Sequence, residues 1–140
     1  MSVSAEPLDV TLGHRSTIRA HPDRSAADEA PAILAAGIVA HVGFVADGQP
    51  FVIPMAYHCD PENPRRLYLH GAPATRLIQH LATGAPACVT VTLVDGLVYS
   101  RTALYHSVNY RSVVCFARAS GTRYAAADAA VLDRMIARYF

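Results

Sequence analysis

The residues from 66 to 76 combine side chains and backbone groups that bind anions. An apolar stretch ends at His70, Gly71-Ala-Pro interrupts it, and a helical pattern begins near Thr75 and Arg76. The first amide groups of a helix are unpaired and carry the positive end of its dipole. A hydroxyl and a planar guanidinium are two further kinds of phosphate ligand. The segment predicts a phosphate site; a plain strand-to-helix connection with a solvated arginine is the alternative.

A second run of hydrogen-bonding side chains lies at the start of a later apolar stretch. It consists of Asn109, Tyr110, Arg111 and Ser112. Polar groups that are buried need hydrogen-bond partners. A heteroaromatic ligand with carbonyl and ring-nitrogen acceptors would supply them. A turn followed by a strand with one polar face explains the same residues equally well.

The histidines near these segments indicate ligand binding rather than metal binding. No two of His58, His70 and His106 have the i, i+4 or His-x-His spacing of metal ligands, so we expect no metal site. His70 is the candidate proton donor, because a histidine can change its charge near neutral pH. His106 precedes Ser107, but neighbours in a strand point to opposite faces. We therefore expect no hydrolytic triad.

Length, charge and cysteine content narrow the class of protein. The chain has 140 residues, a formal net charge of +1 and three widely separated cysteines, Cys59, Cys88 and Cys115. Without a Cys-x-x-Cys motif, these are expected to be free thiols in a reducing cytoplasm. No apolar run approaches the roughly 20 residues that span a bilayer, and no signal peptide is visible. We expect one cytoplasmic domain without nucleic-acid or membrane partners.

Apolar periodicity and turn residues predict a mainly β chain with a few helices. Asp47-Gly48 is typical of a two-residue hairpin turn between strands 38–46 and 50–58. Pro54 cannot donate to a strand ladder, so it predicts an edge, a bulge or a ligand beside it. Asp95-Gly96 marks a further turn or bulge. The other predicted elements are strands at 65–70, 87–94, 97–104 and 110–119, and helices at 25–37, 74–81 and 125–140.

The order of these elements predicts a barrel. Antiparallel strands joined by tight turns, with helices between them, favour a barrel with helices packed at its ends. In the first helix, Ser25-Ala-Ala-Asp28 has the spacing of a capping box, Pro31 fits the first turn, and Gly37 suits the C-terminal end. Residues 1–24 are expected to form an extended N-terminal arm, and residues 25–140 a single domain.

Four segments, in order, resemble one protein family. They are Gly43-Phe-Val-Ala-Asp-Gly-Gln-Pro50 with Ile53-Pro-Met-Ala-Tyr57, then Leu67-Tyr-Leu-His-Gly-Ala72 with Arg76, then Cys88-Val-Thr-Val-Thr92, then Ser107-Val-Asn-Tyr-Arg-Ser-Val113. The chain resembles the pyridoxamine 5′-phosphate oxidase-like flavoproteins. Within them it is most similar to the subgroup of nitroimidazole-resistance reductases and flavin-nucleotide-binding proteins. The resemblance covers roughly 15–118, and the part after Ala119 matches poorly.

The resemblance implies an antiparallel FMN-binding split β-barrel and a homodimer with FMN at the subunit interface. The arm with Arg15 and Arg19 would cross that interface. The cofactor-binding residues that it implies are Pro54, Met55, Ala56, Tyr57, His70, Gly71, Thr75, Arg76, Asn109, Tyr110, Arg111 and Ser112.

Three functions are compatible with such a pocket. The first is an FMN-dependent oxidoreductase acting on an unidentified small molecule, with the flavin performing the redox chemistry. The second is a non-catalytic FMN-binding, storage or redox-sensing module. The third is a haem-handling split barrel with His70 or His106 as the axial ligand, since the fold does not determine the cofactor. Oxidation of vitamin B6 is not expected, because residues 123–140 hold no clear counterpart of the substrate-binding residues of the true oxidases.

Overall fold

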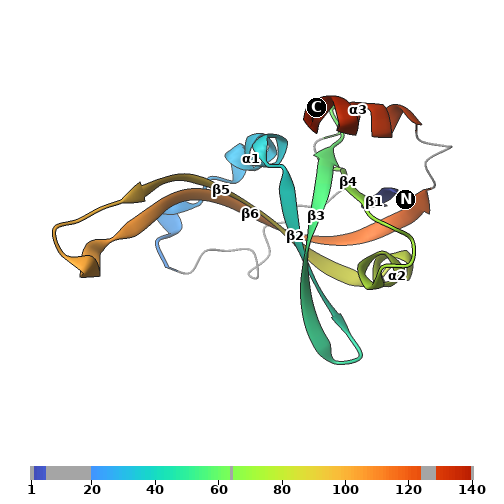
Figure 1. Ribbon diagram of the computed structural model, residues 1–140, viewed down its shortest axis with the longest axis horizontal. Coiled ribbons are helices and arrows are strands. Elements are labelled where there is room, and N and C mark those ends of the chain that lie inside the picture. Colours follow the sequence, from blue (N-terminus) through green and yellow to red (C-terminus); the bar gives the residue numbers. More distant parts are fainter. Residues whose placement is uncertain (1, 6–19, 64, 124–128, 140) are drawn as a thin grey trace.

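The computed structural model describes residues 2–5, 20–63, 65–123 and 129–139. Within these residues, six antiparallel strands and three α-helices form the fold (Figure 1). The strands are β1 (Ser2–Ala5), β2 (Val39–Ala46), β3 (Gln49–Cys59), β4 (Leu67–His70), β5 (Pro86–Val98) and β6 (Ser107–Arg123). The helices are α1 (Ala30–Ala36), α2 (Arg76–Ala82) and α3 (Ala129–Tyr139), and short 3-10 turns lie at Pro22–Arg24, Ala27–Glu29 and Ala103–Tyr105.

The strands follow the order β1-β4-β3-β2-β5-β6. β1 pairs with β4 on one side and with β6 on the other, so hydrogen bonds run around the whole barrel. The predicted fold class, a mainly β antiparallel split barrel, is confirmed. β1 takes up residues 2–5 of the predicted arm, while Arg15 and Arg19 lie outside the described residues.

The β2–β3 hairpin matches its prediction. Asp47 has φ 51° and Gly48 has φ 76°, the left-handed pair that a two-residue turn of type I′ requires. Pro54 lies opposite His41 of β2. Among the described residues, β4 pairs with β3 only at Tyr57, His58 and Cys59. Pro54 therefore lies where the other edge of β3 has no strand partner in the described part of the chain, as its missing N–H predicts.

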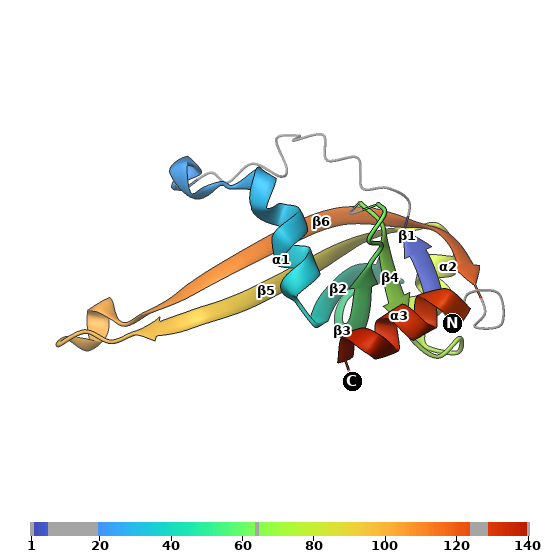
Figure 2. The same cartoon turned by 90° about the horizontal axis from the view of Figure 1, so that it is seen from above.

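The strand predicted at 97–104 is wrong. β5 continues through Asp95-Gly96 with a bulge between Val94 and Gly96, and it pairs with β6 as far as Val98. At this bulge, Arg111 of the facing strand binds the Asp95 carboxylate through two hydrogen bonds. The C-terminal part of β5 and the N-terminal part of β6 pair with each other on either side of the 3-10 turn at Ala103–Tyr105. They form a long ribbon that projects from the barrel (Figures 1 and 2).

The first helix is shorter than predicted. A 3-10 turn occupies Ala27–Glu29 and α1 begins at Ala30, so the predicted capping box is wrong. The first buried residue of the helix is Ile33, and the residues of the preceding 3-10 turn are not buried against the sheet. Pro31 does lie in the first turn. Gly37 is the C-cap of the helix, and its φ of −71° is one that any residue can adopt. Glycine is needed here because there is no room for a side chain. A Cβ at Gly37 would lie 2.4 Å from Val91 Cγ1.

The core fills the barrel between β2, β3, β5 and α2. Its most buried side chains are Val42, Tyr57, Leu77, Ile78 and Val91. α3 lies across the outer side of the barrel near β3 and β4, as Figures 1 and 2 agree, with Met135 buried beneath it. None of the helices in the described ranges is long and apolar enough to cross a membrane.

Candidate functional site

The four cofactor-binding residues that were predicted on β3 are divided between the two faces of the strand. Tyr57 is fully buried, and its hydroxyl donates to the Leu34 carbonyl at 2.5 Å, which satisfies one of the last carbonyls of α1. Met55 is half-buried and packs against the same core. Pro54 and Ala56 alternate with them and are exposed. Only the outward pair can offer side chains to a ligand, because the inward pair is part of the core.

His70 lines an apolar pocket beneath α3. The pocket has a volume of about 480 Å³ and is open to solvent. Ala56 and Ile38 form its wall on the sheet, and Leu132, Met135 and Ile136 form its wall on α3. Apart from His70 and Tyr139, its lining side chains are aliphatic. This arrangement suits a flat apolar group that touches one imidazole.

Tyr139 fastens α3 over this pocket. Its hydroxyl oxygen accepts a hydrogen bond from the Tyr57 amide at 3.2 Å and lies 2.5 Å from the Tyr57 carbonyl oxygen. It also lies 3.0 Å from the Ile38 carbonyl oxygen. The β2–β3 ladder ends at Val39 and Ala56, so the Tyr139 side chain satisfies the next backbone groups of both strands, those of Tyr57 and Ile38. The pocket wall is thus tied to the strand that carries Ala56.

The predicted phosphate segment contains one available cation. Thr75 is the N-cap of α2, and its Oγ1 accepts from the Ile78 amide at 3.4 Å and donates to the Ala72 carbonyl at 2.9 Å. The hydroxyl is therefore occupied by the helix. Arg76 is exposed, and its guanidinium lies 4.4 Å from the centre of the Phe51 ring. A cation stacked on an aromatic face keeps its N–H groups free for an anion at its edge.

Gly71 provides the close packing between this segment and β3. A Cβ at Gly71 would lie 2.6 Å from Met55 Cε and 3.2 Å from Ile78 Cγ1. A side chain here would displace the end of Met55 and crowd Ile78, so glycine lets the chain leave β4 close to β3 and enter α2 without that rearrangement. Gly71 therefore positions the segment and presents no side chain to a ligand.

The third predicted group lies apart from the other two. Asn109, Tyr110, Arg111 and Ser112 are all exposed on β6, in the projecting ribbon. Figures 1 and 2 both place this ribbon away from α2 and α3. Arg111 binds Asp95 through two hydrogen bonds of 2.8 and 2.9 Å, and this pairing lowers the pKa of the Asp95 carboxyl. One copy of the chain does not assemble the predicted set around a single cavity.

The three cysteines are free, as predicted, and burial keeps two of them in the protonated form. Burial raises the pKa of Cys115 to about 11 and also raises that of Cys59. A thiol that stays protonated at neutral pH is a weak nucleophile and a weak metal ligand. Among the described residues, no group of three or more His, Cys, Asp and Glu side chains could hold a metal ion.

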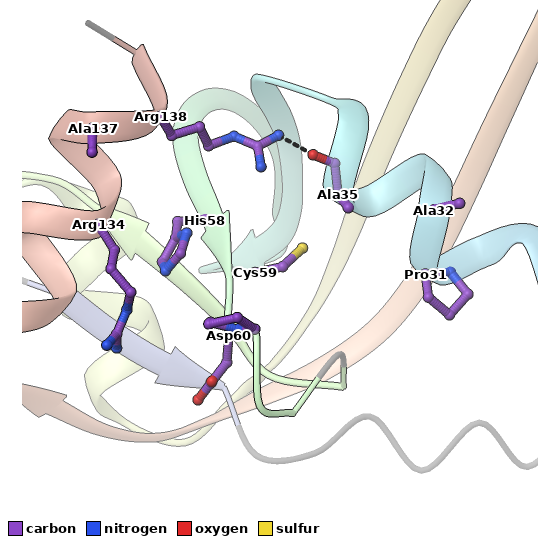
Figure 3. A pocket seen from close by; sticks show the side chains of 10 residues that line it. Pro31, Ala32, Ala35, His58, Cys59, Asp60, Arg134, Ala137 and Arg138 are labelled. Atoms are coloured by element: carbon purple, nitrogen blue, oxygen red, sulfur yellow. Dashed lines mark hydrogen bonds between the residues drawn. The ribbon is translucent and has the colours of Figure 1, made fainter.

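A second groove contains residues to which sequence reasoning assigned no role. His58, Asp60, Arg134 and Arg138 line it, between α1 and α3 (Figure 3). The only signal in the sequence was the four-residue spacing of the two arginines on the predicted C-terminal helix. That spacing places both on one helix face, but which face meets the sheet depends on tertiary packing.

Comparison with solved structures identifies proteins of similar fold. The chain is 33% identical to the flavocytochrome Anf3 from Azotobacter vinelandii, with a TM-score of 0.73 over 89% of this chain and 57% of that one. It is 29% identical to an FAD- and haem-binding protein from Mycobacterium smegmatis, with a TM-score of 0.68 over 81% of this chain and 54% of that one. The chain thus spans little more than half the length of these two proteins.

A third solved structure shows the likeness of fold alone. It is a protein assigned to 5-nitroimidazole antibiotic resistance in Bacteroides thetaiotaomicron, 23% identical, with a TM-score of 0.63 over 83% of this chain and 68% of that one. No curated protein sequence matches the chain.

The family match covers more of the C-terminal part than the sequence analysis expected. It runs from residue 26 to residue 140 and so includes α3, although the likeness was expected to fade after Ala119. Because the family model for pyridoxamine 5′-phosphate oxidase matches residues 26–140, the chain belongs to that family.

Proposed function

We propose that this chain is a flavin-binding protein that holds FMN between two copies of itself. Membership of the family supports the flavin, as do the relatives named a flavocytochrome and an FAD- and haem-binding protein. The second copy is supported by an uncovered apolar surface on the barrel, which is the observation that carries the proposal.

That surface is the outward face of β2, β3, β5 and β6. Val52 lies opposite Gly43, Gly43 opposite Cys88, and Cys88 opposite Phe116, so the four residues share one face. Val52 is 68% exposed and Phe116 is 55% exposed. Contiguous apolar surface of this kind is typical of an interface or a ligand surface. A flat isoalloxazine ring and a second sheet would both bury it.

The projecting ribbon continues this apolar surface. Its exposed large side chains include Leu97, Tyr99, Leu104 and Tyr110. In a dimer, the ribbon would reach across the second copy and bring residues 109–112 near its His70 and Arg76. The groups that one copy holds apart would then line one cavity.

Arg76 is the reason for proposing FMN in place of a flavin without phosphate. It is an exposed cation held against Phe51, and it needs no rearrangement to bind a phosphate through two hydrogen bonds. α2 is short, and Thr75 already satisfies the Ile78 amide, so the side chain of Arg76 carries this assignment.

The proposed activity is that of an oxidoreductase acting on a small molecule. The flavin would supply the electron transfer. His70 would hold the proton that the reaction needs, beside the apolar wall of its pocket. A non-catalytic FMN-binding, storage or redox-sensing module would use the same residues. An experiment that distinguishes the oxidoreductase from the non-catalytic module is to mix FMN-loaded protein with NADH or NADPH in the absence of oxygen. In the oxidoreductase, the flavin should lose its blue absorption by reduction faster than free FMN does. In the non-catalytic module, it should not.

Haem binding is a second candidate, favoured by the pocket of His70. In many haem proteins, one histidine binds the iron and apolar side chains surround the ring. The pocket of His70 has a single imidazole among apolar side chains. His106 is less suited, because it lies exposed at the end of the ribbon and its Nδ1 accepts the Ser100 amide at 3.0 Å. A Soret band after addition of haem, lost in His70→Ala, would support this candidate.

The decisive experiment is a visible spectrum of the purified protein before and after addition of FMN and removal of the excess. The paired near-ultraviolet and blue bands of a flavin that stays with the protein would support the proposal. A flat spectrum after FMN is offered would contradict it.

A further inference from the structure

The groove between α1 and α3 is separate from the pocket of His70. It has a volume of about 560 Å³ and lies where β3 ends, with α1 on one side and α3 on the other (Figure 3). Pro31, Ala32 and Ala35 form an apolar wall on α1. The polar side chains His58, Asp60, Arg134 and Arg138 gather on the opposite side.

His58 lines this groove and has an unpaired ring nitrogen. The side chain is only 7% exposed, and its Nε2 has no hydrogen-bond partner among the described residues. The ring stacks on Tyr68 with 5.8 Å between the ring centres, so it is held in place. Buried ring nitrogens are normally paired. An unpaired one in a side chain that lines a groove can be satisfied by a ligand atom, once a small movement of the ring exposes it.

Two guanidinium groups enter the same groove from α3. Arg134 and Arg138 are one turn apart, and Figure 3 shows them on either side of His58. Arg138 donates to the carbonyls of Ala35 and Gly37, at the end of α1. Its Nε is buried and has no partner among the described residues. Arg134 therefore remains as the arginine that can meet a ligand directly.

The one carboxylate in the groove is already compensated. Asp60 accepts from the Tyr68 hydroxyl at 3.0 Å and from the Glu62 amide at 3.0 Å, and Arg66 lies 3.4 Å from it. Two arginines against one satisfied carboxylate leave the groove positive. The groove therefore favours an anion over a neutral ligand.

We propose that this groove binds a small organic monocarboxylate, with its carboxylate held by Arg134 and His58 Nε2 and its apolar body against Pro31, Ala32 and Ala35. Burial, and then the charges of Arg134 and Arg138, lower the pKa of His58, while Asp60 raises it. The imidazole is therefore neutral in the empty groove. Its Nε2–H tautomer can donate to a carboxylate, and a bound carboxylate would raise the pKa of His58.

Benzoate is a suitable probe, with benzamide as its neutral counterpart and inorganic phosphate as an anion that has no apolar body. Titration into the purified protein, followed by the imidazole NMR signals of His58, should show saturable binding of benzoate. Benzamide loses the charge and phosphate loses the contact with the apolar wall, so each should bind about tenfold more weakly or worse. Benzoate binding should tighten as the pH falls through the pKa of His58, because the imidazolium adds a positive charge facing Arg134, Arg138 and Asp60.

Two variants separate the groove from a general charge effect. Arg134→Gln should weaken benzoate binding about tenfold or more, since it removes one charge-assisted contact from an exposed helix position. Arg65→Gln makes the same change of charge at an exposed residue outside the groove and should leave binding unchanged. Equal binding of benzoate and benzamide, no saturable benzoate binding, or equal binding by wild type and Arg134→Gln would overturn the proposal.

The test does not depend on the flavin. Benzoate binding is measured on flavin-free protein and again with FMN present. Unchanged binding is expected, since the groove and the pocket of His70 are lined by different residues. Displacement of benzoate by FMN would assign the groove to the flavin and overturn a separate site.

Discussion

The guanidinium of Arg76 lies 4.4 Å above the ring of Phe51, so the first residue of α2 is held against β3. Phe51 itself stacks on Phe44 of β2 at 5.4 Å between ring centres, and Phe44 is buried. The cation is therefore supported by aromatic rings that are anchored in the barrel. A side chain held in this way loses little conformational freedom when it binds an anion.

Arg76→Ala should weaken FMN binding by about 1.5–3 kcal/mol, which is the scale of a charge-assisted hydrogen bond. The measurement is a fluorescence titration of flavin-free protein with FMN. Riboflavin, which has no phosphate, should bind wild type and variant alike. Arg65→Ala, at an exposed arginine away from Phe51, should bind FMN as wild type does. Equal FMN affinity of Arg76→Ala and wild type would remove Arg76 from the phosphate site.

The ribbon should be required for assembly. Sedimentation velocity of the wild type at micromolar concentration should show a dimer. Leu104→Glu places a charge on a side chain that is 83% exposed, so the fold of a single copy should be unaffected while the dimer dissociates. The affinity of this variant for FMN should also fall, because the proposed cavity is lined by residues of both copies. Gln79→Glu is the control, because it adds the same charge at an exposed position on α2, and it should remain dimeric. A wild-type protein that is monomeric would contradict the shared cavity.

Tyr57→Phe should destabilise the fold by about 1–3 kcal/mol, since it leaves the buried Leu34 carbonyl without its hydroxyl donor. Urea unfolding followed by circular dichroism measures this difference. Tyr99→Phe, at a residue that is 80% exposed, is the matched control and should be neutral. If both variants unfold at the same urea concentration as wild type, the hydrogen bond contributes nothing net.

The same tyrosine predicts a loss of stability in alkali. Burial raises the pKa of Tyr57 in the folded chain above its ordinary value. The unfolded chain therefore loses this proton first, and the contribution to stability is present below about pH 10 and falls as the pH rises beyond it. Urea midpoints measured from pH 8 to pH 11 should decline less in Tyr57→Phe than in wild type. Parallel curves would show that other groups cause the decline.

Gly37→Ala should be destabilising by about 1–3 kcal/mol, the usual range for overpacking a core. Its Cβ would lie 2.4 Å from Val91 Cγ1 and 2.5 Å from the Tyr57 hydroxyl oxygen. Gly96→Ala is the control, because a Cβ there meets nothing within 4 Å. Thermal unfolding of the two variants compares them directly. A Gly37→Ala protein as stable as Gly96→Ala would mean that α1 shifts away without cost.

The sequence by itself determined the local elements whose signals are short-range. Asp47-Gly48 specified a two-residue hairpin because its residues tolerate positive φ. The alternation of β3 and the apolar face of α2 followed from periodicity alone. With the order of the four segments, these were enough to predict the barrel and the family.

Only the tertiary structure decided which of the candidate side chains are available to a ligand. Tyr57 was predicted at the flavin, but its hydroxyl is used by α1, and Thr75 is used by its own helix. The start of α1 and the long ribbon were also missed, because a capping pattern and an Asp-Gly pair are each compatible with two backbone paths. The groove of His58 arises where β3, α1 and α3 meet. Burial, pairing and the meeting of distant elements depend on packing between segments far apart in sequence, and no local pattern encodes them.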